Sequence, residues 1–320
     1  MTLEQIKEIP KVELHVHLDG SINIELASKL SEQNIETLKK KMIAYNTKNL
    51  NEYLEKFELP ISLMQTKENL SLISECLAND LKKDNVIYAE IRFAPSLHTK
   101  EGLSHEEIID AVLSGLNKVK TIKTNLILCL MRGANYEENL KTIEMACKYL
   151  NNGVVGIDLA GAEALYKNEE YEDLFKIVKE KNIPFTIHAG EASNYKSVES
   201  AVLFGAKRIG HGINSIQNKD LLEKLKKEEI VLEICPTSNI QTKAVLDYPK
   251  HPIKELYRSG VMVTINTDNR TVSNIDLNNE YLNLNKTFNF IEKDFKIMNK
   301  NAINGAFLSN EEKDELLKLI

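Results

Sequence analysis

The chain has 320 residues, of which 42% are hydrophobic and 28% are charged, and its formal net charge is −6 at pH 7. This composition is typical of a folded globular protein and argues against disorder, and the acidic balance disfavours nucleic acid, whose phosphates are bound by clustered Lys and Arg. No apolar run reaches the roughly 18 residues of a membrane span, the N-terminus has no signal segment, and the four cysteines show no close pairing, so we expect a cytoplasmic protein without a membrane partner.

Eight short runs rich in β-branched residues recur along the chain, and a helix-like stretch follows most of them. This alternation predicts an α/β protein with a parallel sheet, and eight strands are the number that a closed (β/α)8 barrel, the TIM barrel, requires. An open doubly wound sheet is the alternative, but for nucleotides it usually has a GxGxxG turn after its first strand, which this chain lacks. The expected strands are 12–18, 86–94, 125–131, 154–160, 184–189, 208–213, 230–235 and 261–267, and the clearest helices between them are 104–122, 137–150, 171–181 and 218–228.

Two segments depart from the regular alternation. About 65 residues separate the first two strands, where a plain βα unit needs about 30. This insertion has helical patterns at 23–33, 50–59 and 66–85, and the tail after residue 270 also reads as helical. Neither segment has the composition of a linker, so we expect one domain over residues 1–320, with a helical insertion after the first strand and helices at the C-terminus.

Imidazole and carboxylate groups gather where the predicted strands end. In a barrel the carboxyl ends of all strands meet at one face, and functional residues lie there. Taken singly, each of these residues has an ordinary explanation as a core histidine, a turn residue or a helix cap, and only their coincidence at one rim favours a site. They are His15, His17, Asp19, His188, Glu191, His211, Asp268 and Asn269. The other three histidines, His98, His105 and His251, lie in predicted loops or helix starts, and we assign them no role.

Three histidines and one carboxylate can bind a divalent metal, and zinc is the leading candidate because it prefers nitrogen and oxygen ligands of this kind. Two metals would normally need a further bridging group, often a modified lysine on the fourth strand. That strand ends in DLAGAE and has no lysine, so we expect one zinc ion. Zinc with an open coordination position lowers the pKa of its water toward neutrality, which makes a nucleophile available.

Six motifs occur in order, each at a predicted strand end: HVHLDGS, DLAGAE, HAGE, GHGI, CPTSN and NTDN. With these motifs the chain resembles the adenosine deaminase family of metal-dependent hydrolases, from near residue 9 to about residue 310. The resemblance implies a zinc-dependent enzyme of purine salvage. It would deaminate adenosine and 2′-deoxyadenosine to inosine and 2′-deoxyinosine with release of ammonia.

The resemblance also implies catalytic roles. Glu191 would act as the proton donor to N1 of the purine, and His211 would orient or deprotonate the attacking water. Asp268 would accept a hydrogen bond from that water as well as bind the metal. The implied ligands of one Zn²⁺ are His15, His17, His188 and Asp268.

Substrate contacts follow from the same resemblance. Gly161 would offer its backbone to N3, Asn269 would face N7, and Asp19 would bind a ribose hydroxyl, with His17 beside the substrate. Many relatives have a second Asp where this chain has Asn269. An amide is a donor at every pH, so the change should preserve the contact with the purine. Ala162 replaces a polar residue that some relatives have, and its consequence stays open.

Alternative functions remain at this stage. Relatives act on adenine, AMP or N6-methyl-AMP, and adenine-specific ones tend to have a longer acid where this chain has Asp19. A phosphate ester would also meet repulsion from that carboxylate, so a nucleoside is the expected small-molecule partner. Another metallohydrolase on the same barrel and a non-catalytic purine-binding protein are the more distant alternatives. The sequence leaves open the oligomeric state, the preference between adenosine and deoxyadenosine, and the metal that is bound in the cell.

Overall fold

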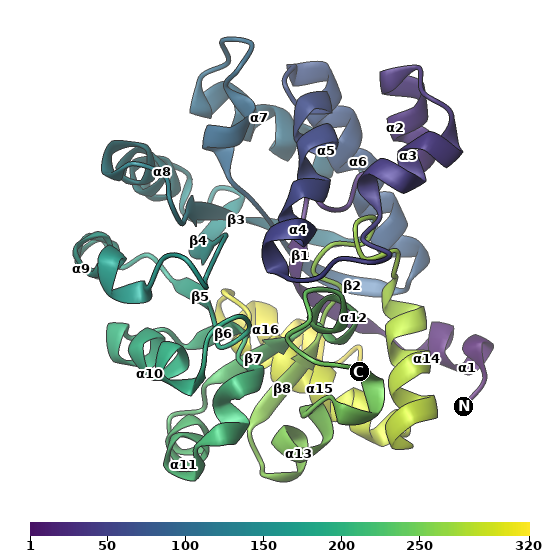
Figure 1. Ribbon diagram of the computed structural model, residues 1–320, viewed down its shortest axis with the longest axis vertical. Helices are drawn as coiled ribbons and strands as arrows, with labels where there is room; N and C mark the ends of the chain where they lie inside the picture. Colours follow the sequence, from purple (N-terminus) through teal and green to yellow (C-terminus); the bar gives the residue numbers. More distant parts are fainter.

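Eight parallel strands form a barrel in the computed structural model, which describes residues 1–320 (Figure 1). Each strand pairs with the next one along the chain, and a bridge between Val16 and Asp268 brings the last strand end back to the first. The predicted (β/α)8 barrel is therefore confirmed. The strands are β1 (Lys11–His17), β2 (Val86–Phe93), β3 (Lys123–Met131), β4 (Val154–Ala160), β5 (Phe185–Ala189), β6 (Arg208–His211), β7 (Val231–Ile234) and β8 (Met262–Ile265).

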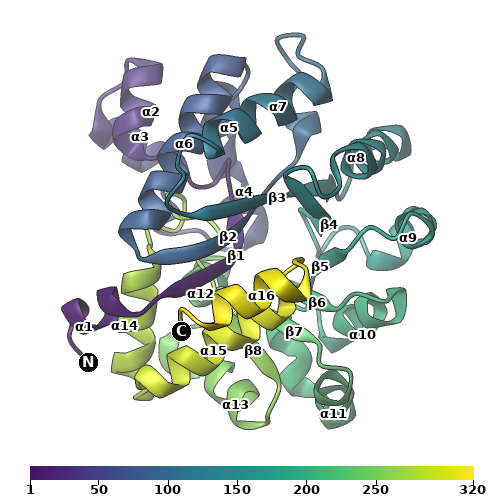
Figure 2. The ribbon, with the colours of Figure 1, turned by 180° about the vertical axis from the view of Figure 1, so that it is seen from behind.

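Helices surround the barrel, and the C-terminal helices α15 and α16 cross the face that is turned toward the viewer in Figure 2. None of them is both long and apolar enough to span a membrane. The insertion and the tail are helical, as expected. That residues 1–320 form one domain stays a prediction. The helices are α1 (Leu3–Glu8), α2 (Ile24–Ser31), α3 (Ile35–Met42), α4 (Leu50–Leu54), α5 (Glu58–Leu63), α6 (Lys67–Lys83), α7 (His105–Leu116), α8 (Tyr136–Tyr149), α9 (Glu172–Glu180), α10 (Tyr195–Phe204), α11 (Lys219–Lys227), α12 (Pro236–Gln241), α13 (Ile253–Arg258), α14 (Leu277–Phe288), α15 (Glu292–Gly305) and α16 (Asn310–Leu317), with 3-10 turns at Glu55–Phe57, Pro95–His98, Asn168–Tyr171, Ile213–Gln217 and Tyr248–Lys250.

Some predicted boundaries were wrong. The helix predicted over 104–122 ends at Leu116, because the N–H groups of Lys118 and Val119 donate to carbonyls three residues back and tighten the chain into a turn. The stretch 50–59 is not one helix but α4, a 3-10 turn and the start of α5. The strand predicted over 261–267 ends at Ile265, since the N–H of Thr267 donates to the side chain of Glu13 instead of a neighbouring strand.

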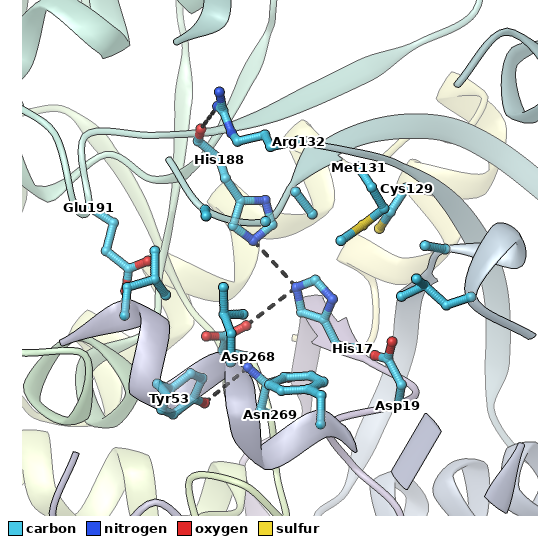
Figure 3. Close-up of a pocket in the computed structure, with 18 of the residues that line it drawn as sticks. His17, Asp19, Tyr53, Cys129, Met131, Arg132, His188, Glu191, Asp268 and Asn269 are labelled. Atoms are coloured by element: carbon cyan, nitrogen blue, oxygen red, sulfur yellow. Dashed lines mark hydrogen bonds and ion pairs between the residues drawn. The ribbon is translucent and has the colours of Figure 1, made fainter. Parts of the chain in front are cut away.

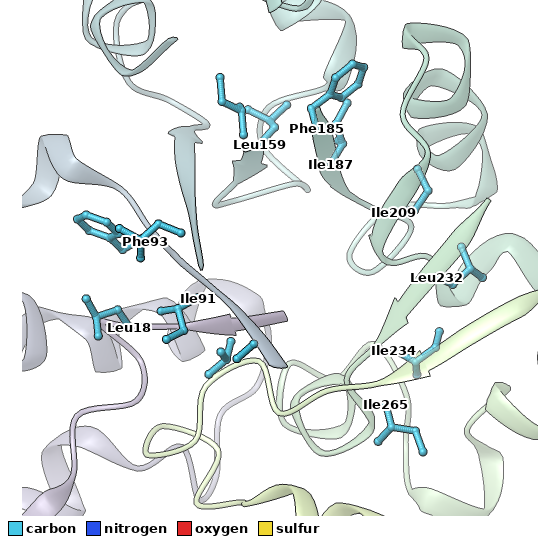
Figure 4. Packing of buried hydrophobic residues seen from close by; sticks show 14 of the residues in the cluster. Leu18, Ile91, Phe93, Leu159, Phe185, Ile187, Ile209, Leu232, Ile234 and Ile265 are labelled. Carbon is cyan, nitrogen blue, oxygen red and sulfur yellow. The ribbon is translucent and has the colours of Figure 1, made fainter. Parts of the chain in front are cut away.

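The apolar core lies between the strands and the surrounding helices. Side chains alternate along a strand, so one set faces the helices and the other faces the barrel axis. Most of the outward set belongs to a cluster of 67 buried hydrophobic residues, whereas Val12 and Leu14 of β1 belong to a smaller cluster with residues of α15 and α16. Figure 4 shows members of this cluster at Leu18, Ile91, Phe93, Leu159, Phe185, Ile187, Ile209, Leu232, Ile234 and Ile265.

The inside of the barrel is charged, unlike the branched apolar filling of most TIM barrels. Arg92 pairs with Asp158 at 3.0 Å and with Glu233 at 2.8 Å. Arg208 pairs with the other oxygen of Glu233 at 2.6 Å and also with Glu90. All five side chains are fully buried. Two carboxylates of this network, those of Glu233 and Asp158, also contact histidines at the carboxyl ends of the strands.

Candidate active site

A pocket of about 260 Å³ opens at the carboxyl ends of the strands (Figure 3). Polar side chains from the strand ends form its floor, and Cys129 and Met131 of β3 line one side. The opposite cover comes from the insertion, which the sequence identified as helical but did not connect to the site. These covering residues are Leu50, Tyr53, Leu54, Phe57 and Ile61.

The predicted histidines and aspartate come together in this floor. Nε2 of His17 lies 3.3 Å from Nε2 of His188 and 3.4 Å from Oδ1 of Asp268. Nε2 of His15 lies 3.4 Å from the same oxygen. The ring of His211 lies 4.9 Å from that of His15, measured between centroids. The chain thus gathers five residues from β1, β5, β6 and the loop after β8.

Two of these histidines are oriented from below by the charged barrel interior. Nδ1 of His15 lies 2.8 Å from Glu233, and Nδ1 of His188 lies 2.9 Å from Asp158. Burial alone would raise the pKa of Glu233, but the guanidinium of Arg92 and its neighbour Arg208 hold it well below its usual range. An ionised carboxylate only accepts, so each Nδ1 carries a proton, and in the neutral ring, the form that binds a metal, Nε2 presents a lone pair to the pocket.

These residues fit a metal ion. Nε2 of His15 is buried and has no hydrogen-bond partner, which is costly unless something else engages its lone pair. Ligand atoms of His15, His188, His211 and Asp268 all lie within 4.8 Å of one another, as do those of His17, Asp158 and His188. Imidazole nitrogens with a carboxylate oxygen suit a divalent transition metal. The group could therefore hold such an ion.

Glu191 lies on the loop after β5 and lines the pocket. Burial raises the pKa of its carboxyl to about 8, and the negative charge of Asp268 adds to this shift. Asn239 and Thr242 each donate to Oε1 at 2.9 Å, while Oε2 lies 3.6 Å from Nε2 of His211. Because Oε1 already accepts two hydrogen bonds, the proton belongs on Oε2. The carboxyl is an acid at neutral pH.

His211 and Asp268 occupy an unusual backbone conformation. Both have φ of 61°, in the left-handed region. This conformation costs a non-glycine residue about 1 to 3 kcal/mol and is concentrated at functional sites. The side chain of Asp268 is held by Ser238, whose hydroxyl donates to Oδ2 at 2.5 Å, so Oδ1 is left to face His15 and His17.

The predicted substrate residues also line the pocket. Asp19 is 5% exposed, burial raises its pKa to about 7, and its Oδ1 has no partner. In Figure 3, Asp19 and Glu191 lie on opposite sides of the histidines. Gly161 has φ of 103°, which glycine adopts without strain. The amide nitrogen of Asn269 donates to the hydroxyl of Tyr53 at 3.0 Å, a contact with the insertion that the sequence did not predict.

Glu163, a buried carboxylate beside the pocket, was not among the site residues predicted from the sequence. It accepts hydrogen bonds from the backbone N–H groups of residues 190–193 and from the hydroxyl of Ser197. This carboxylate therefore fixes the loop that carries Glu191. Its position in DLAGAE, at a predicted strand end, was the signal that could have identified it.

The short helix α12, which follows β7, was also missed as part of the site. Ser238, Asn239 and Thr242 each contact a predicted site residue, and Asn239 in turn contacts His251 at 3.2 Å. We assigned no role to His251, and the structure places it directly behind the site. The CPTSN motif at the end of β7 was the available signal.

Comparisons with known proteins identify the family of the chain. The family model described as adenosine deaminase matches residues 10–320. An adenosine deaminase of Clostridium acetobutylicum is 41% identical to this chain in an alignment that covers 98% of each of the two proteins.

Solved structures show the same fold. Arabidopsis ADAL complexed with IMP superposes with a TM-score of 0.88 at 28% identity, covering 98% of this chain and 96% of that one. Adenine deaminase from Arthrobacter aurescens superposes with a TM-score of 0.87 at 25% identity, covering 97% and 98%. The family model and the bacterial relative each span nearly the whole chain, so the protein belongs to the adenosine deaminase family, as its motifs predicted.

Proposed function

We propose that the protein catalyses the hydrolytic deamination of adenosine and 2′-deoxyadenosine to inosine and 2′-deoxyinosine, with release of ammonia and with one Zn²⁺ per subunit. The observation that carries this proposal is the pairing in one pocket of an acid, Glu191, with a group of residues that could hold a metal. The 41% identical adenosine deaminase supports the substrate. The predicted cytoplasmic location stays a prediction.

His15, His17, His188 and Asp268 would hold the zinc ion. Support comes from the lone pairs that His15 and His188 present to the pocket and from the close approach of His17 to both His188 and Asp268. When bound there, zinc would act as a Lewis acid and lower the pKa of a water molecule toward neutrality.

Glu191 supplies the proton that the purine ring needs. Transfer from Oε2 to N1 draws electrons away from C6, so that water can add to this carbon. Asp268 accepts a hydrogen bond from that water, and His211 lies beside it. The bond between C6 and the amino nitrogen then breaks, and the nitrogen leaves as ammonia with its own two hydrogens and one proton of the water. The other proton of the water restores Glu191. The ring keeps the oxygen of water and the proton on N1, and inosine results.

The rest of the pocket selects a nucleoside. Asp19, on the far side of the histidines from Glu191, would accept from a ribose hydroxyl, while Gly161 and Asn269 would meet the purine edge. Arg132 is the only Lys or Arg that lines the pocket. Its two Nη atoms already donate to carbonyls of Tyr166 and His188 and to the side chain of Asn168, and these contacts hold the guanidinium against the protein, which disfavours a phosphate as its partner.

Adenine is the second candidate substrate, because an adenine deaminase shares the fold closely at 25% identity. The test follows the ultraviolet change on deamination for adenosine, adenine, AMP and N6-methyl-AMP in parallel. We expect kcat/KM to be highest for adenosine. Preference for adenine would contradict the role given to Asp19, and preference for a nucleotide would contradict the argument from Arg132.

A further inference from the structure

A chain of hydrogen bonds runs behind the pocket from the backbone of Ile253 through His251 to Asn239. The backbone N–H at its start decides which atom donates and which accepts in each bond. His251, which precedes α13, is 3% exposed, and its Nδ1 lies 3.1 Å from the backbone N–H of Ile253. A backbone N–H can only donate, so Nδ1 of His251 must accept. Burial lowers the pKa of His251 to about 3, so the ring is neutral and carries its single proton on Nε2.

The proton on Nε2 of His251 in turn fixes the orientation of the side-chain amide of Asn239. Nε2 of His251 lies 3.2 Å from Oδ1 of Asn239, so the amide oxygen accepts there. The amide nitrogen then faces the site and has two acceptors for its two protons: Oε1 of Glu191 at 2.9 Å and Nδ1 of His211 at 3.0 Å. The opposite orientation of the amide would set its nitrogen against the N–H of His251 and its oxygen against the carboxyl of Glu191. The backbone N–H of Ile253 therefore excludes that orientation.

We propose that His251 is a positioning residue that acts through Asn239 and fixes two features of the reaction centre: the tautomer of His211 and the oxygen of Glu191 that carries the proton. Because Nδ1 of His211 accepts, its proton lies on Nε2, the atom that lies nearest to Glu191. Because Oε1 of Glu191 accepts from Asn239, its proton lies on Oε2. The proposal rests on the proposed deamination for its catalytic meaning, but the hydrogen-bond directions can be measured without it.

The assigned tautomer narrows the role of His211. With a proton on Nε2, this atom donates a hydrogen bond to the attacking water and does not remove a proton from it. It also has no lone pair for a metal, although His211 lies within reach of His15, His188 and Asp268. His15 and His188 have a carboxylate behind Nδ1, whereas His211 has an amide N–H there. His211 thus has the opposite tautomer to His15 and His188, because an amide N–H and not a carboxylate lies at its Nδ1.

Nitrogen-15 NMR of the metal-loaded protein, labelled at its histidine rings, tests the assignment without any substrate. Ring nitrogens that carry a proton and those that do not have clearly separated chemical shifts, and the variant His251→Gln identifies the signals of His251. We expect His211 and His251 both to be protonated at Nε2 and unprotonated at Nδ1. A proton on Nδ1 of either ring would overturn the proposal.

Two substitutions at His251 test the effect on catalysis. Gln can still donate to Asn239, and Leu cannot. We expect His251→Leu to lower kcat by about 10- to 100-fold with KM and metal content little changed, and His251→Gln to recover most of the loss. Equal kcat for the Leu variant and the wild type, or equal losses in both variants, would overturn the proposal.

His98→Leu is the matched control, since His98 is another buried neutral histidine, bonded to the carbonyl of Met64, that contacts none of the site residues. It should lower thermal stability while kcat stays within about twofold of the wild type. If the wild type deaminates no purine, the proposed function fails, and the NMR result still decides the hydrogen-bond directions.

Discussion

Nδ1 of His188 donates to Oδ2 of Asp158 at 2.9 Å, and the same carboxylate oxygen pairs with Arg92 at 3.0 Å. A histidine of the rim is thus oriented by a charge inside the barrel. Burial alone would raise the pKa of Asp158, but His188 and the guanidinium of Arg92 hold it well below its usual range, so the carboxylate stays ionised. The charged residues inside the barrel therefore orient a histidine of the site, in addition to any contribution they make to the stability of the fold.

Asp158→Asn tests this orientation. The amide is uncharged and cannot hold the proton on Nδ1 of His188 as firmly, so we expect metal affinity to fall about 10- to 100-fold. Chelator competition with metal analysis of the purified protein measures it. Arg92 keeps its pair with Glu233 but loses a buried carboxylate partner, so the free energy of unfolding should also fall, by about 3 kcal/mol.

Glu13→Gln is the matched control for a buried carboxyl of the barrel. Burial raises the pKa of Glu13 to about 8, so the group is already uncharged at neutral pH, and Gln keeps an acceptor for Thr267. We expect unchanged metal affinity. Equal metal affinity in the Asp158 variant and this control would show that the carboxylate does not orient His188.

Glu191→Gln removes the proton donor but keeps the oxygen that accepts from Asn239 and Thr242. The fold and the metal content should remain, and kcat should fall by about 10²- to 10⁴-fold. Stopped or continuous ultraviolet assays with metal analysis check this. Glu199→Gln, on the helix that follows, should keep the wild-type rate, and a Glu191 variant as fast as that control would exclude Glu191 as the acid.

The activity should fall at alkaline pH. Burial raises the pKa of Glu191 to about 8, so the carboxyl holds its proton below this pH and loses it above. Since only the protonated form is the acid, kcat/KM should decrease about tenfold for each pH unit beyond 8. A pH profile of kcat/KM from 6 to 10 measures this, and a flat profile would contradict the assigned protonation state.

Glu163→Gln should misplace the acid. Its carboxylate accepts four backbone N–H groups of the loop 190–193, and an amide replaces one of the two accepting oxygens by a donor. We expect kcat to fall by about 10²-fold, because a small displacement of a reacting group slows the reaction strongly. The free energy of unfolding should fall by about 1 to 3 kcal/mol. Loss of stability with an unchanged kcat would show that Glu163 supports the fold but not the position of Glu191.

The sequence predicted the rim of the site well because strand residues follow a simple rule. Alternation places His15 and His17 on one side of a strand, and parallel strands bring their carboxyl ends together, so His188, His211 and Asp268 join them. The order of the motifs then identified the family, which the comparisons confirm.

Contacts between distant segments were not predictable in the same way. Glu233 pairs with arginines 141 and 25 residues away in the chain, and no periodic pattern reveals which charges meet inside a barrel. Tyr53 reaches Asn269 across 216 residues, so the helical pattern of the insertion indicated its structure but not that it covers the pocket. Asn239 and His251 were visible as motif or loop residues, and only the three-dimensional contacts connect them to His211.

Deamination of adenosine in water enriched in oxygen-18 tests the central claim most directly. Hydrolysis replaces the amino group by the oxygen of water, so we predict one oxygen-18 atom in each inosine and one ammonia for each adenosine consumed. Mass spectrometry of the product and an ammonia assay measure both. Unchanged adenosine with the metal-loaded enzyme, or release of adenine instead of inosine, would contradict the proposed function.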